Sequence, residues 1–198
     1  MSTDPALPTT PAARAALEVA ARYHSPAMRD HCIRSYRWAA ELGRLRGYAV
    51  DDELLFVAAL LHDIGLTPEF DNVTLPFEHA GGHVARVFAA GAGWPAERGD
   101  RAGEIIVHHM GEVPDPAVDP EGYLLSVATG LDISGRDAEW WPEELRREVV
   151  ARYPRGDLAA EFIGCLREQA ERKPDSTAAA AVTSGIAGRM ASNPLEAL

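Results

Sequence analysis

One stretch limits the fold of this chain more than any other: the residues from Leu54 to Leu61 include no polar side chain. A helix that is apolar on every face belongs in the interior of a protein. The acidic residues 51–53 precede it and suit a helix N-terminus, and Gly65 follows it and can turn freely. We therefore predict a buried central helix whose far end presents His62 and Asp63 together.

The rest of the sequence also predicts helices, separated by segments rich in proline and glycine. No alternation of apolar and polar residues is long enough to indicate a sheet, so the expected fold class is all-α. A loop is expected at 67–76 and a weak helix or tail at 174–198. The helices are expected at residues 11–23, in the stretch from about 29 to Gly47, at 77–90, before Met110, before Asp132, at about 142–153 and at 157–173.

Composition sets the outer limits. A chain of 198 residues with 46% hydrophobic residues suits one domain, 1–198, with its core at about 25–136. The net charge of −11 argues against nucleic acid or an anionic membrane as partner, so we expect a small-molecule substrate. Formation of a homo-oligomer is left open. No apolar run approaches the length of a membrane span, no leader is evident, and there are two cysteines, so we expect a cytoplasmic protein.

Two further residues, a second histidine and a second aspartate, are candidates to act together with the His62-Asp63 pair. His31 lies in a predicted helix, and Asp132 ends a second uncharged run that begins at Tyr123. The order His, His-Asp, Asp resembles the HD-domain superfamily of metal-dependent hydrolases. Three segments resemble its cyanamide hydratase-like branch more narrowly: Asp30-His-Cys-Ile-Arg34, Phe77-Glu-His-Ala-Gly-Gly-His-Val-Ala-Arg86 and Leu131-Asp-Ile-Ser-Gly135.

The resemblance implies an HD-domain helical bundle in which His31, His62, Asp63 and Asp132 bind one metal ion. Two imidazoles and two carboxylates suit a divalent transition metal, with zinc as the first expectation and iron, manganese or nickel as alternatives. Such an ion activates water or polarises a substrate. We therefore expect a metal-dependent hydratase or hydrolase acting on a small polar substrate, with the conversion of cyanamide to urea as the reaction of the branch.

Four more histidines lie between the two halves of this ligand set: His79, His83, His108 and His109. Dinuclear HD proteins place extra histidines there, so a second metal and a diiron oxygenase remain alternatives. For His79 and His83, an exposed pair on a helix face is an equally good interpretation. The resemblance favours His109 over His108 as a pocket residue or ligand. A non-enzymatic regulatory module is a further alternative, although the ligand set is complete.

The substrate is the least constrained feature. Leu66 stands where many phosphate-cleaving HD proteins have a lysine, so an HD phosphohydrolase of nucleotides or phosphoesters is the weaker alternative. Thr67, in the loop that we expect to close over the ion, is a candidate catalytic residue. Glu78 matches the glutamate of the branch and is a candidate to orient a histidine or move a proton. Arg34 is expected either to provide positive charge to the substrate or to pair with an acid.

Overall fold

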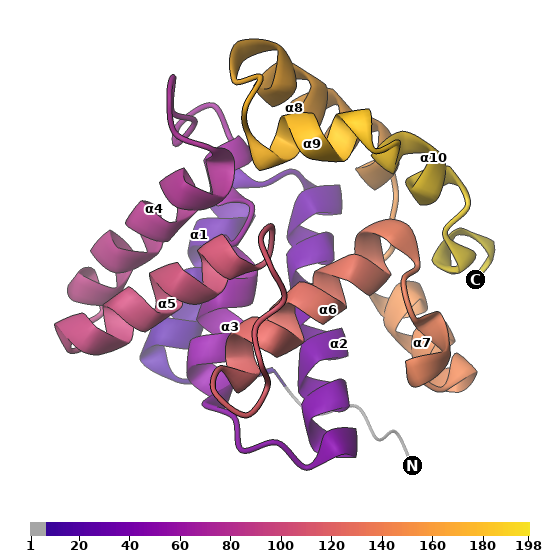
Figure 1. The fold of residues 1–198 in the computed structure, drawn as a ribbon. Helices are drawn as coiled ribbons and strands as arrows, with labels where there is room; N and C mark the ends of the chain where they lie inside the picture. Colours follow the sequence, from indigo (N-terminus) through magenta and orange to yellow (C-terminus); the bar gives the residue numbers. More distant parts are fainter. Residues whose placement is uncertain (1–6) are drawn as a thin grey trace.

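The computed structural model describes residues 7–198, and this part of the chain is helical without a strand (Figure 1). The all-α prediction is confirmed. Most predicted helices lie where the pattern placed them, because each begins or ends at a capping residue or a proline. Their bounds are α1 Pro11–Tyr23, α2 Pro26–Arg46, α3 Asp52–Leu61, η1 Ile64–Leu66, α4 Phe77–Gly91, α5 Ala96–His108, α6 Pro120–Ser134, η2 Ala138–Trp140, α7 Glu143–Arg152, α8 Leu158–Arg172, α9 Thr177–Thr183, α10 Ile186–Ala191 and η3 Pro194–Ala197.

The central helix α3 is buried, as its composition predicts. Every residue from Leu54 to Leu61 is at most 5% exposed. Asp51 caps the helix by accepting a hydrogen bond from the Leu54 amide, and α1, α2 and α5 pack around it. The interior of the fold is thus built on α3. Its C-terminal end, where His62 follows Leu61, is consequently enclosed by other helices.

The α4 and α5 helices form an antiparallel pair beside the end of α3 (Figure 1). The approach of α4 to the end of α3 depends on small residues. A Cβ atom on Gly65 would lie 2.1 Å from the Phe77 carbonyl oxygen, and one on Gly81 would lie 3.2 Å from the His62 carbonyl oxygen. The close contact of α4 with the turn after α3 therefore excludes a side chain at position 65.

The C-terminal segment is more ordered than the sequence predicts. Residues 174–198, expected to be a weak helix or tail, form α9, α10 and η3, and Figure 1 shows α9 beside α8 across one end of the bundle. These helices are short, so tertiary packing rather than propensity stabilises them. A second buried cluster of apolar side chains holds them to the bundle: Met28, Leu66, Phe77, Ile133, Leu158, Phe162, Leu166, Ala178, Ile186 and Met190. Within residues 7–198, no helix has the length and hydropathy of a membrane span.

Candidate metal centre

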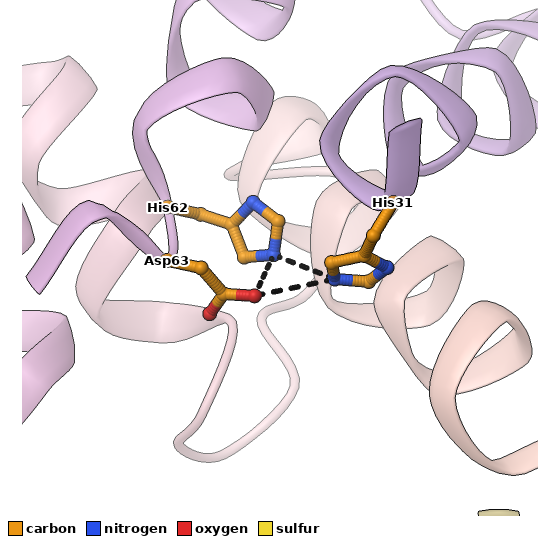
Figure 2. A group of neighbouring side chains, drawn as sticks. All are labelled: His31, His62 and Asp63. Atoms are coloured by element: carbon orange, nitrogen blue, oxygen red, sulfur yellow. Dashed lines mark hydrogen bonds and ion pairs between the residues drawn. The ribbon is translucent and has the colours of Figure 1, made fainter. Parts of the chain in front are cut away.

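Three of the predicted ligands converge at the end of α3. His62 and Asp63 come from the turn after α3, and His31 reaches them from α2 (Figure 2). The Nε2 atoms of His31 and His62 are 3.1 Å apart, and Asp63 Oδ2 lies 3.3 Å from the first and 3.1 Å from the second. All three side chains are 1% exposed. Such separations are those of neighbouring ligand atoms around an ion with bonds of about 2 Å.

Hydrogen bonds behind the rings direct the Nε2 atoms at one another. His62 Nδ1 donates to the Ala59 carbonyl oxygen at 2.7 Å, and His31 Nδ1 donates to Asp132 Oδ2 at 2.6 Å. The Nε2 atoms then face Asp63, and neither buried carboxylate oxygen of Asp63 has a hydrogen-bond partner among residues 7–198. Lone pairs that meet in a buried place require positive charge between them. The three residues therefore fit a divalent cation.

The pKa shifts of these residues also indicate that the site needs positive charge. Burial lowers the pKa of His62, but the charge of Asp63 outweighs it and raises the pKa to about 9. Burial likewise opposes protonation of His31, while Asp132 and Asp63 raise its pKa overall. For Asp63 burial raises the pKa, but His62 and His109 bring it well below its usual range. Protons balance the carboxylate in the metal-free protein, and a bound ion would displace them.

Asp132 does not join this group, and here the structure departs from the predicted set of four. The metal-ligating atoms that lie together among the described residues belong to His31, His62 and Asp63. Asp132 is hydrogen-bonded to the Nδ1 atom of His31, on the side of the ring that faces away from His62 and Asp63. In this geometry Asp132 orients the ring of His31, as the outer partner of a metal-bound histidine does.

The surroundings of Asp132 explain its position. Arg34 donates to both carboxylate oxygens at 2.9 Å, and the indole N–H of Trp38 donates to Oδ1 at 2.8 Å. The side chains of Arg34 and Asp132 are fully buried. Although burial raises the pKa of Asp132, Arg34 and His31 hold it well below the usual range. Arg34 thus pairs with an acid, which is the second of its two predicted roles, and it does not line the cavity as the first role would require.

The end of α6 that carries Asp132 is held by C-terminal residues that the sequence patterns did not single out. Asn193 donates to the carbonyl oxygens of Leu131 and Asp132 at 3.2 and 2.9 Å. Arg155 donates to the same Asp132 carbonyl at 2.8 Å and pairs with Glu196 at 2.7 Å. No motif connects position 193 with position 132, so only the folded chain reveals this support.

His31, His62 and Asp63, which we call the metal group, lie at the buried end of a cavity of about 400 Å³. His109 also lines this cavity, with its Nε2 atom 3.6 Å from Asp63 Oδ1 and its side chain 3% exposed. His109 Nδ1 donates to the Ile106 carbonyl, so Nε2 is the ring nitrogen that faces Asp63. The structure thus places His109 in the pocket, where the resemblance favoured it.

The loop after the His-Asp pair does not cover the site. None of the residues at 67–76 lines the cavity. The Thr67 hydroxyl donates to the Ile64 carbonyl at 2.8 Å, Phe70 packs against Tyr23, and Asp71 binds the end of α8. The prediction of Thr67 as a catalytic residue therefore fails on position. Helices α8–α10 provide the wall that we expected from this loop.

Glu78 is buried at the start of α4 but also lies outside the cavity lining. Its Oε1 accepts a hydrogen bond of 2.8 Å from the Thr177 hydroxyl, and Thr177 does line the cavity. This contact joins α4 to α9. Glu78 has no hydrogen bond to a histidine among the described residues, so the predicted orienting role is not seen. Its contact with Thr177 is instead structural.

The second metal site is not assembled. His79 and His83 are exposed on α4, and neither lines the cavity. The side chain of His108 is 45% exposed and binds Asp119 at 3.1 Å. Only His109 of the four candidates lies near the metal group. The positions of these side chains therefore argue against the dinuclear alternative, and with it against the diiron oxygenase.

Comparison with known proteins agrees with the ligand pattern. The sequence matches the HD domain family over residues 28–155, which includes all the metal-group residues. The chain belongs to the HD domain family. It is also 26% identical over 171 residues to the cyanamide hydratases DDI2 and DDI3 of Saccharomyces cerevisiae. Each alignment covers 84% of this chain and 76% of the relative. Within the family, the chain is similar to the cyanamide hydratase-like branch.

Proposed function

We propose that this HD protein adds water to the carbon of a nitrile-like substrate, as in the hydration of a cyanamide group to a urea. One observation carries the proposal: His31, His62 and Asp63 converge within 3.3 Å at the enclosed end of a cavity. The similarity to two cyanamide hydratases supports the choice of substrate group. A bound divalent ion would supply Lewis acidity and lower the pKa of water.

The residues of the site would have separate roles. His31, His62 and Asp63 would hold the ion, and Asp132 would keep the His31 ring in place through Nδ1. His109 lines the cavity, and because its Nδ1 atom is bound to the Ile106 carbonyl, Nε2 is its available ring nitrogen. It is therefore placed to take a proton from the attacking water and return one to the substrate nitrogen. The buried walls would exclude other water from the reacting group.

The test measures metal content and hydration together. Protein purified without added metal is analysed for its elements, then assayed with cyanamide by following urea formation. His62→Ala and Asp63→Ala should each abolish tight metal binding and lower turnover by at least about a hundredfold. His79→Ala, an exposed histidine outside the site, is the matched control and should behave as the wild type. Full metal content and turnover in either site variant would refute the proposed centre.

A phosphoester hydrolase remains a second candidate because of one feature. Two arginines, Arg136 and Arg189, line the same cavity. Our sequence prediction against phosphoesters rested on Leu66, which does not line this cavity. The same purified protein is therefore assayed with nucleoside monophosphates. Phosphate release without any hydration of cyanamide would replace the proposed reaction with this one.

A further inference from the structure

The cavity is much larger than cyanamide. Pockets of about 300–1,000 Å³ bind ligands the size of drugs or cofactors. The cavity here has about 400 Å³. Cyanamide consists only of a nitrile and an amino group, so it would leave most of this volume to water. The space beyond the metal group indicates a substrate with a substantial additional part.

The walls indicate that this part begins as an apolar chain. Phe162 and Leu166 of α8, Ala181 of α9 and Ile186 of α10 line the cavity. Phe162 and Leu166 are at most 4% exposed, so they belong to the packed interior. All four residues lie beyond the match to the HD domain family, which ends at residue 155. The C-terminal helices therefore provide part of the apolar wall of the cavity from outside the matched family domain.

The rim of the cavity is positively charged. Arg136, after α6, and Arg189, in α10, line it and are exposed, whereas the metal group is buried. Neither guanidinium has an ion pair with any residue in 7–198. Arg189 donates to the carbonyl oxygen of Ser184, another lining residue, and to its hydroxyl at 3.1 Å. Asp63 is the one acid among the described lining residues, and it lies in the metal group.

Two guanidinium groups that have no ion pair within residues 7–198 lie at the mouth of a largely apolar cavity and suit an anion, because arginine binds carboxylates and phosphates through two parallel hydrogen bonds. On a protein of net charge −11, this positive rim is a local exception. The anion would lie at the solvent end, away from the reacting group at the buried end.

We infer that the substrate is a monosubstituted cyanamide whose apolar chain ends in an anionic group, which Arg136 and Arg189 bind at the rim. The inference rests on the proposed function for the reacting group only. In the reaction, R–NH–C≡N and H2O give R–NH–CO–NH2. The water oxygen ends in a double bond to carbon, both π bonds between the nitrile carbon and nitrogen are lost, and both water hydrogens end on the former nitrile nitrogen.

The experiment compares alkylcyanamides that carry a terminal carboxylate, a terminal phosphate or a neutral methylamide. Urea formation gives kcat/KM, and calorimetry with the corresponding ureas gives binding without turnover. The anionic compounds should exceed both the methylamide and cyanamide in kcat/KM by about tenfold. Arg136→Gln and Arg189→Gln should each reduce the ratio of anionic to neutral kcat/KM by about three- to tenfold. The carboxylate and phosphate arms identify which anion the rim prefers.

Arg167→Gln removes an exposed arginine of α8 that does not line the cavity, and it should leave this ratio unchanged. Thermal melting checks that all three variants fold. If cyanamide is hydrated but anionic chains show no advantage, or keep it in both rim variants, the inference is wrong and the proposed function stands. If no cyanamide is hydrated while anionic ureas bind in an Arg136- and Arg189-dependent way, the proposed function fails and the anion site stands.

Discussion

Replacement of Arg34 by methionine tests how the metal group is held. The Arg34 side chain is fully buried and makes four hydrogen bonds. Two go to the carboxylate of Asp132 and two to the carbonyl oxygens of Tyr153 and Pro154, each of these at 3.0 Å. Methionine fills similar space without a donor. Arg34→Met therefore leaves a buried carboxylate without its strongest partner and two carbonyl oxygens unpaired.

The magnitude follows from these contacts. Removing one partner of a buried ion pair costs about 3–5 kcal/mol of the free energy of unfolding. Trp38 and His31 still bind Asp132, and Arg155 lies 3.5 Å from it, which favours the lower part of that range. For a chain of this size, the melting temperature should fall by roughly 6–20 °C.

Urea unfolding of the metal-free protein, followed by circular dichroism, measures this loss. Arg147→Met is the control, because Arg147 pairs with Glu143 at the surface and the two side chains are 63% and 55% exposed. The double variant Arg34→Met with Asp132→Asn should lose less than the sum of the two single variants, since both remove the same interaction. A loss below about 1 kcal/mol in Arg34→Met, or strict additivity, would refute the role assigned to this pair.

Three further changes probe other parts of the structure. Gly65→Ala should destabilise the fold and the metal group, because its Cβ would meet the Phe77 carbonyl oxygen at 2.1 Å, and melting curves would show it. Asp132→Asn should weaken metal affinity about 10–100-fold while keeping one ion per chain, as measured by competition with a chelator; complete loss of the ion would instead make Asp132 a direct ligand. Asp119 caps α6. Burial raises the pKa of Asp119, but Arg101 lowers it below its ordinary value, so the stabilisation is present above the ordinary pKa and is lost as the pH falls through the lower folded pKa. Asp119→Asn should reduce the pH dependence of the free energy of unfolding in this acidic range by about 1 kcal/mol. An unchanged pH profile would contradict the capping role.

The sequence by itself determined the helices and the centre of the fold. The run from Leu54 to Leu61 has no polar side chain, so burial was its only stable place. Capping residues and prolines act over a few neighbouring positions, which is why α1 and α3 begin where the pattern predicts. The His62-Asp63 pair and His31 were also identified from sequence, because the spacing of an HD pattern records which helices carry the ligands.

Only the tertiary structure decided how the remaining side chains are used. Position in the chain suggested the loop of Thr67 as the cover, but packing of apolar side chains placed α8–α10 there instead. The partners of Asp132 come from residues 34, 38 and 155, which no local pattern relates to one another. Capping and periodicity act within one helix, whereas hydrogen bonds and cavities depend on contacts between distant segments. The orientation of His31 and the charged rim at Arg136 and Arg189 therefore emerge only once the helices are packed.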